Sequence, residues 1–229
     1  MTKTLIIIFF ILTFTVPAGA TQTYVMSGVV TDVSGKPSAG ADVAVYLGPN
    51  VKKPADFISN RTGADGKYSL ALPQGHYWAV AVLRKDGRKF GPLGLHDKHS
   101  GGAVELDAGP DEDMVYNFTV MALKDAALKA RKRNKDLLEV SGRIMGPDGK
   151  PAALAYALAD PGRKFKLIPR YLSAWTDNSG HYSLFLPPGH FYIGAAGHFP
   201  PKAGYLLKDG LTLKADRHNF NLSLRAGQK

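Results

Sequence analysis

The residues with the potential for chemistry are mainly histidines, and two of them lie three positions apart in the segment HDKH at positions 96–99. His96, His99 and the intervening Asp97 are ligand types that zinc and copper accept. Lys98 opposes a bound cation, however, and the spacing does not bring the two imidazoles together on a helix or a strand. His96 and His99 are therefore weak metal-ligand candidates, and solvated loop histidines are the preferred interpretation.

The chain lacks the spaced motifs that mark common catalytic sites. No histidine is followed by glutamate three residues later, no His-x-His pair occurs, and no Gly-x-Ser-x-Gly segment indicates a nucleophilic serine. The absence of cysteine excludes thiol chemistry and thiolate metal sites. We therefore expect a non-enzymatic protein without a cofactor. The alternative is a metal-dependent enzyme or metal-binding protein that uses the loop of His96 and His99.

A second kind of candidate site comes from two matching pairs of a histidine and an aromatic residue. If Tyr77 and the alternate residues after it face the core, strand geometry turns the residues between them outward. A flat ring beside an imidazole suits a sugar ring or a protein surface. The candidate binding residues are His76, Trp78, His190 and Tyr192. The alternative is that Trp78, Val80 and Val82 are covered by the other module, a helix or a loop.

These pairs belong to a sequence repeat. Thr62–Tyr77 (TGADGKYSLALPQGHY) recurs as Thr176–Phe191 (TDNSGHYSLFLPPGHF), at an offset of 114. The turn pairs Asp65-Gly66 and Ser179-Gly180 are typical of β-hairpins, and the alternation after each turn predicts a strand with one covered face. We expect the core to include Tyr68, Leu70, Leu72, Tyr77, Ala79 and Ala81, and in the second copy Tyr182, Leu184, Leu186, Phe191, Ile193 and Ala195.

The repeat continues on both sides, with changes in spacing. We match the strand expected at Ala41–Leu47 to Ala153–Ala159, and the closing segment Asn117-Phe118 to Asn219-Phe220 at an offset of 102. The first copy would then have about twelve extra residues, around Gly87–Pro110. A short strand is expected there, at Ala103–Leu106.

The pattern G-x-V-x-D-x-x-G-x-P, followed by T-x-x-x-G-x-Y-x-L-x-L-P-x-G-x-Y, resembles the carboxypeptidase regulatory-like domain. The first copy carries it on Gly28, Val30, Asp32, Gly35, Pro37, Thr62, Gly66, Tyr68, Leu70, Leu72, Pro73, Gly75 and Tyr77. The second carries it on Gly142, Ile144, Gly149, Pro151, Thr176, Gly180, Tyr182, Leu184, Leu186, Pro187, Gly189 and Phe191. The resemblance covers about four fifths of the mature chain.

The resemblance implies an all-β fold. Two tandem transthyretin-like or Ig-like seven-stranded β-sandwiches, of the carbohydrate-binding-like fold group, would be joined by a short basic helix. Modules of this family are usually non-catalytic and serve in adhesion, scaffolding or ligand binding, so the resemblance implies a fold more directly than a function.

The expected helix is Leu123–Leu138, which contains strong helix formers and neither glycine nor proline. Its charged side chains give a net charge of +4. We interpret it as an exposed spacer. The alternative is a docking element for an acidic partner or an anionic membrane surface, through Lys129, Arg131, Lys132, Arg133 and Lys135.

The N-terminus has the features of a secretory signal peptide. Lys3 precedes a twelve-residue apolar run, Leu5–Val16, and Ala18-Gly19-Ala20 fits a cleavage site. The run is too short to span a bilayer, although an uncleaved anchor is the alternative. We predict an exported protein, periplasmic or extracellular at the cell surface. The expected order is 1–20 signal peptide, 22–122 first sandwich, 123–137 basic linker and 138–226 second sandwich.

The charge balance narrows the expected partners. The chain has 29 basic and 19 acidic residues, a net charge of +10, and loss of Lys3 with the signal would leave +9. A basic protein outside the cytoplasm meets acidic glycans, headgroups and protein faces before it meets nucleic acid. We therefore expect an envelope protein or polysaccharide as the partner, and no nucleic acid.

Overall fold

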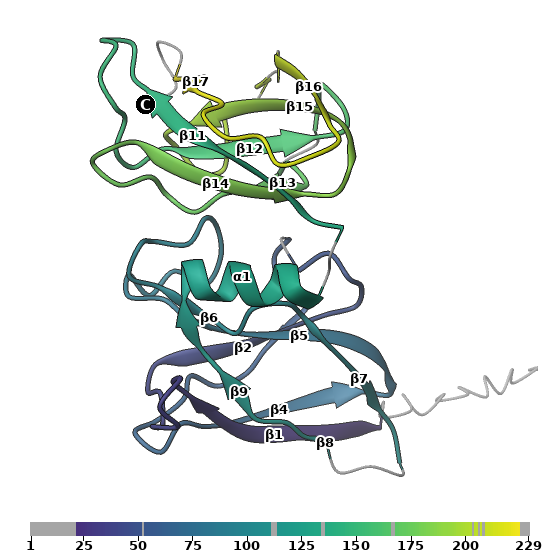
Figure 1. Ribbon diagram of the computed structural model, residues 1–229. Helices are drawn as coiled ribbons and strands as arrows, with labels where there is room; N and C mark the ends of the chain where they lie inside the picture. The colour runs from purple at the N-terminus through teal and green to yellow at the C-terminus, as the bar shows by residue number, and fades with distance from the viewer. Residues whose placement is uncertain are drawn as a thin grey trace, which may run out of the picture.

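The protein folds into two β-sandwiches, with helix α1 (Leu123–Arg133) lying between them in the view of Figure 1. The computed structural model describes residues 22–51, 53–110, 114–133, 136–165, 168–202, 204–205, 207 and 209–224. The predicted signal peptide and Lys135 lie outside the described residues. The predicted all-β class, with two sandwiches joined by a short basic helix, is confirmed.

The first sandwich consists of two facing sheets. One has the order β4-β1-β8, with β9 also paired to β1, and the other has the order β10-β6-β5-β2-β3, with β7 paired to β5. The strands are β1 (Thr23–Thr31), β2 (Ala41–Tyr46), β3 (Phe57–Ile58), β4 (Lys67–Pro73), β5 (Gly75–Leu83), β6 (Lys98–His99), β7 (Val104–Ala108), β8 (Met114–Val115), β9 (Phe118–Thr119) and β10 (Met121–Ala122).

The second sandwich repeats this plan with fewer strands. Its sheets have the orders β14-β11-β17 and β13-β12-β15-β16. The strands are β11 (Leu138–Met145), β12 (Tyr156–Asp160), β13 (Tyr171–Leu172), β14 (His181–Leu186), β15 (Gly189–Ala196), β16 (Asp209–Leu213) and β17 (Leu222–Ser223). The helix is shorter than expected, because Leu138 already begins β11.

Each sandwich has its core between its two sheets, and the predicted alternation is confirmed. Tyr68, Leu72, Tyr77, Ala79 and Ala81 are buried in the first core, and Leu70 is partly buried against it. In the second core the buried residues include Tyr182, Leu184, Leu186, Phe191, Ile193 and Ala195.

The repeated residues make the same structural bonds in both copies. The hydroxyl of Thr62 accepts from the backbone N–H of Ala41 (2.8 Å) and donates to the carbonyl of Ser38 (2.7 Å). Thr176 makes the equivalent bonds to Ala155 (2.9 Å) and Ala152 (2.6 Å). The motif threonine therefore joins two turns in each sandwich, which explains its place in the pattern without a ligand.

The tyrosine and glycine of the motif serve contacts between strands of the same sheet. Tyr68 donates its hydroxyl to the carbonyl of Tyr116 (2.6 Å), and Tyr182 donates to that of Phe220 (2.5 Å). Burial raises the pKa of both phenols, so both remain protonated donors. A Cβ on Gly142 would lie 2.3 Å from the same Phe220 oxygen, so only glycine permits this approach.

Two matches proposed between the copies are wrong by two residues. The shared bonds of Thr62 and Thr176 align Ala41 with Ala155, so the offset of 114 also holds for β2 and β12. The closing segments align at 104, since Asn117 and Asn221 bond the equivalent N–H groups of Val29 and Arg143. Asn219 instead takes a left-handed conformation, with φ of 57°, before β17. The predicted short strand is present as β7, Val104–Ala108.

Candidate functional site

The first histidine and aromatic pair lies on the outer face of β5, opposite the core. The imidazole of His76 meets the indole of Trp78 edge-on, with 4.6 Å between ring centroids and 86° between planes. Nδ1 of His76 lies 2.6 Å from a carboxylate oxygen of Asp107, and Nε2 lies 3.8 Å from Glu105. We call these four residues the His76 cluster.

Sequence reasoning identified His76 and Trp78 but missed Glu105 and Asp107. The two acidic residues lie on β7, which pairs antiparallel with β5 so that His76 faces Asp107 and Trp78 faces Glu105. The alternation of β7 (VELDA) indicated a strand, but not which strand it pairs with. The two alternatives for Trp78 were an exposed ring and a covered one. The structure lies between them, because Trp78 is half-buried whereas Val80 is buried.

The second pair is arranged similarly but has different neighbours. His190 and Tyr192 meet edge-on at 5.1 Å and 89°. The neighbour of His190 on β16 is the hydroxyl of Thr212, at 3.1 Å, and Gly210 stands opposite Tyr192. The guanidinium of Arg163 lies over the Tyr192 ring at 5.0 Å. The two pairs therefore share geometry but not charge.

The predicted metal candidates do not form a ligand cluster. His96 is exposed, whereas His99 belongs to β6 and accepts the N–H of Gly101 on Nδ1 (3.0 Å). Asp97 is buried and accepts the backbone N–H groups of Lys85 (2.8 Å) and Gly94 (2.7 Å). Among the described residues no group of three or more histidine, aspartate and glutamate side chains is placed to hold a metal ion.

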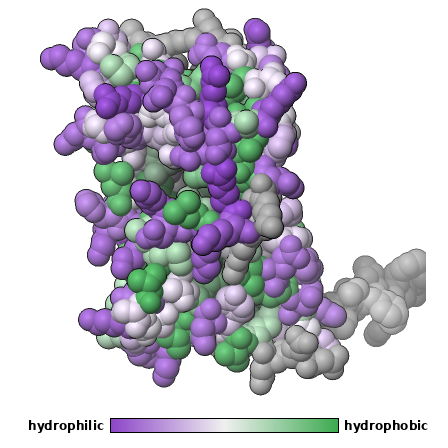
Figure 2. Space-filling model, viewed as in Figure 1, coloured by the Kyte–Doolittle hydropathy of each residue, from purple (hydrophilic) through white to green (hydrophobic). Residues whose placement is uncertain are grey.

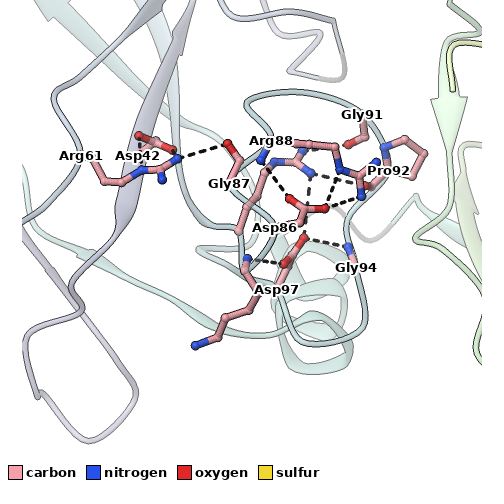
Figure 3. Close-up of polar contacts among 11 residues, drawn as sticks. Asp42, Arg61, Asp86, Gly87, Arg88, Gly91, Pro92, Gly94 and Asp97 are labelled. Atoms are coloured by element: carbon pink, nitrogen blue, oxygen red, sulfur yellow. Dashed lines mark hydrogen bonds and ion pairs between the residues drawn. The ribbon is translucent and has the colours of Figure 1, made fainter.

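Asp97 instead organises the loop 84–97, which follows β5 (Figure 3). Arg84 lies 3.9 Å from Asp97 and donates to the carbonyls of Gly91 (2.8 Å) and Pro92 (3.3 Å). Burial lowers the pKa of the Arg84 guanidinium, and the negative charge of Asp97 acts against this shift. The guanidinium stays charged. Asp97 thus binds backbone N–H groups of the loop and Arg84 binds its backbone carbonyls, so together they hold the loop in one conformation.

This loop contacts the second sandwich. The backbone N–H of Trp175 donates to the carbonyl of Leu93 (2.9 Å), and the rings of Phe90 and Phe199 meet at 5.2 Å. Gly91 lies so close that a Cβ there would be 2.9 Å from the Phe199 ring. Arg88 lies over the indole of Trp175 at 5.6 Å.

The contacted surface is the outer face of the sheet β13-β12-β15-β16. We call it the outer aromatic cluster, and it consists of buried Tyr156, Leu158, Ala196 and Leu207 with partly buried Phe165, Leu172, Trp175, Tyr192, Phe199 and Tyr205. Tyr156 packs edge-on against Trp175 at 5.0 Å. Sequence reasoning missed this cluster, although its aromatic residues are visible in the sequence.

A second contact between the sandwiches comes from α1. Arg131 is ion-paired to Asp216 (2.7 Å), which also accepts the N–H of Glu139 (2.9 Å). On its other side α1 packs on β6 and β10, and Ala126 is buried. The helix is therefore exposed only in part, because Ala126 is buried whereas Lys124, Asp125, Leu128 and Lys132 are exposed. The proposed docking role of Lys129, Arg131, Lys132, Arg133 and Lys135 stays a prediction.

A serine, a histidine and an aspartate do meet in the turn before β14, but in an order unsuited to catalysis. Nε2 of His181 accepts from Arg143 (3.2 Å), which leaves Nδ1 to donate to the hydroxyl of Ser179 (2.6 Å). Ser179 then donates to Asp177 (2.5 Å). The proton on Nδ1 prevents this histidine from acting as a base toward the serine, so the chain of bonds stabilises the turn.

The hydropathy of the surface and the lengths of the described helices indicate no additional site. Figure 2 shows mainly hydrophilic residues on one face, with hydrophobic ones scattered among them. Within the described ranges no helix has the length and apolarity needed to cross a membrane.

Comparison with known proteins gives distant structural likenesses. No family model and no curated protein matches the chain. Similar solved structures include the Bacillus anthracis TIE protein (13% identity, TM-score 0.29), a streptococcal ancillary pilin (10%, 0.30) and a minor pilin of Streptococcus agalactiae (15%, 0.28). The alignments cover 89%, 90% and 88% of this chain, but 34%, 62% and 94% of those chains. The chain thus spans about a third of the first and less than two thirds of the second.

Proposed function

We propose that this is an exported, non-catalytic binding and scaffolding protein of the cell envelope, whose two carboxypeptidase regulatory-like sandwiches act as one rigid body. The observation that carries the proposal is the contact between loop 84–97 and the outer aromatic cluster. A flexible tether would leave such an apolar surface exposed, whereas here the Phe90 ring lies against Phe199 and the carbonyl of Leu93 accepts from the N–H of Trp175.

Three further features support this role. The predicted signal peptide supports export, the shared residues of the two copies make structural bonds, and Asp97 of HDKH serves loop 84–97 rather than a ligand cluster. A rigid pair of modules holds its outer surfaces at a fixed spacing, which lowers the entropic cost of engaging an extended envelope partner.

Small-angle X-ray scattering of the mature protein tests the rigidity. We expect a single narrow distribution of interatomic distances. Asp97→Asn should broaden it, because the new amide NH₂ group would face the backbone N–H donor of either Lys85 or Gly94. Asp148→Asn, in an exposed turn of the second sandwich, is the matched control and should leave the distribution unchanged. A broad distribution for the unmodified protein would overturn the proposal of one rigid body.

Two measurements test the rest of the proposal. Mass spectrometry of the exported protein should give a mature chain that begins near Thr21, and retention of the first twenty residues would contradict cleavage. Metal analysis of protein purified without chelators or a histidine tag should give no stoichiometric metal. Stoichiometric metal that is lost in His96→Ala or His99→Ala would instead favour the metal-dependent alternative.

A further inference from the structure

The His76 cluster has the composition of a small binding surface. His76 and Asp107 form one cross-strand pair and Trp78 and Glu105 form the next, so all four side chains share the outer face of β5 and β7. The side chains of Asp107, Glu105 and His76 are 79%, 66% and 44% exposed. An aromatic ring, an imidazole and two carboxylates are thus accessible within one two-strand patch.

The carboxylates of the patch have an imidazole beside them rather than a lysine or arginine. Within the described residues neither Glu105 nor Asp107 is ion-paired to lysine or arginine, although the chain has ten more basic than acidic residues. Their neighbour there is the imidazole of His76. Carboxylates accept hydrogen bonds and cannot donate them, so a ligand at this patch must bring donors.

These properties select a class of ligand. A pyranose ring has an apolar face that can lie on exposed indole surface and hydroxyl groups that can donate to carboxylates. Two carboxylates repel phosphate and uronate groups but accept hydroxyls or an ammonium group. The patch therefore fits a neutral or amino-bearing sugar better than an anionic one.

The second copy supplies an internal comparison. At the positions of Asp107 and Glu105 it has Thr212 and Gly210, and the guanidinium of Arg163 lies over Tyr192. Tyr192 is itself part of the outer aromatic cluster, so its ring is less available for stacking. No carboxylate of β16 stands opposite His190 or Tyr192. On β12, Asp160 stands opposite Tyr192, but its oxygens accept the N–H groups of Gly162 and Arg170. The expectation that both sandwiches bind in parallel loses its geometric support.

We propose that the His76 cluster is a glycan-binding site for a neutral or amino-bearing pyranose, and that the His190 and Tyr192 pair is not an equivalent site. The proposal rests on the proposed binding function, and it names the ligand chemistry of one of the two surfaces. It does not depend on the rigidity of the interface between the sandwiches.

Tryptophan fluorescence gives a direct test, because Trp78 and Trp175 are the two tryptophans of the chain. Trp175→Phe isolates the signal of Trp78. Nε1 of Trp175 is buried without a hydrogen-bond partner among the described residues, so the phenylalanine variant forfeits no side-chain hydrogen bond. The probes are hexamers of glucosamine, of N-acetylglucosamine and of galacturonic acid, which are cationic, neutral and anionic.

We expect the glucosamine or the N-acetylglucosamine hexamer to shift the Trp78 emission, and the galacturonate hexamer to bind at least about tenfold more weakly. Binding followed by calorimetry should weaken roughly tenfold in Trp78→Ala and Asp107→Asn. The variants His190→Ala and Tyr192→Ala, as matched controls, should bind as the unmodified protein does.

Several outcomes would overturn this site. They are no response to any of the three hexamers, preference for galacturonate, and equal loss of affinity in the control variants. A lysine-rich peptide that binds equally well to Trp78→Ala and displaces the sugar would instead indicate a non-specific acidic surface. None of these results would alter the scattering of the mature protein, so failure of the site is distinguishable from failure of the rigid-body proposal.

Discussion

At the scale of single residues, the repeat preserves backbone contacts rather than chemistry. Thr176, Tyr182 and Gly142 each serve a turn or a contact between strands of one sheet, and the first copy has the same residue types at the same places. Side chains with ligand-binding potential differ between the copies, as Asp107 and Thr212 do beside their histidines. The residues that the two copies share are therefore those that make structural bonds.

Gly142, which lies against the backbone of Phe220, gives a prediction at this scale. Gly142→Ala should destabilise the second sandwich by about 3 kcal/mol or more, because its Cβ would lie 2.3 Å from backbone oxygen of Phe220, which cannot move like a flexible side chain. Gly149→Ala is the control, since it meets only the strain of a φ of 72° with no atom within 4 Å. Urea unfolding measures both. Equal losses for the two variants would show that the close approach is not the cause.

At the scale of elements, alternation predicted strands well where one face is apolar and the other polar. It failed at Ala153–Ala159 (ALAYALA), because every position there is apolar and the pattern does not show which residues face the core. The resulting shift of two residues hid the exchange of Asp42 for Tyr156, which lies beside that of Arg61 for Trp175 at the same offset of 114. The outer aromatic cluster was invisible for that reason.

Pairing between distant strands was the other limit. His76 and Trp78 were placed outward correctly because their strand follows directly from the repeat. Glu105 and Asp107 reach them only through the pairing of β5 with β7, in the part where the copies diverge. Such long-range pairing is decided by the packing of the whole sheet, which a local pattern does not contain.

The ion pair between α1 and Asp216 predicts how the free energy of unfolding changes at acidic pH. The N–H of Glu139 and the guanidinium of Arg131 hold the pKa of Asp216 below its usual range. This stabilisation is complete above about pH 4, the ordinary aspartate value, and is lost as the pH falls through the lowered pKa of the folded state. The difference in unfolding free energy between the unmodified protein and Asp216→Asn should therefore shrink below about pH 4.

Urea unfolding at a series of pH values checks this expectation. Arg131→Gln should remove the part of the dependence that the ion pair supplies, leaving the part due to the N–H of Glu139. A difference between the unmodified protein and Asp216→Asn that stays constant down to pH 2 would show that Asp216 does not stabilise the fold through its charge.

At the scale of the whole molecule, the two sandwiches meet through a loop of the first module and through the helix between the modules. Loop 84–97 reaches the outer aromatic cluster, and α1 connects β6 and β10 to Asp216. These two contacts support the proposal that modules without disulfides act as one rigid body.

Calorimetry should detect this coupling. We expect one cooperative unfolding transition for the mature protein, and separation into two transitions in Phe90→Ala, with a loss of about 1–3 kcal/mol for a half-buried ring. Leu95→Ala, at an exposed position of the same loop, is the control. Two transitions in the unmodified protein, unchanged by Phe90→Ala, would contradict thermodynamic coupling between the sandwiches.

The exchange at the interface has a consequence for the order of the modules. Where the second sandwich presents the rings of Tyr156 and Trp175, the first has the ion pair of Asp42 and Arg61, with 3.1 Å between charged atoms. Arg61 also donates to the carbonyl of Gly87, within the first module's own loop (Figure 3). The modules are therefore not interchangeable: a chain with two first copies would bring an ion pair against Phe90. The joint between the modules thus has a direction, from loop 84–97 of the first to the outer aromatic cluster of the second.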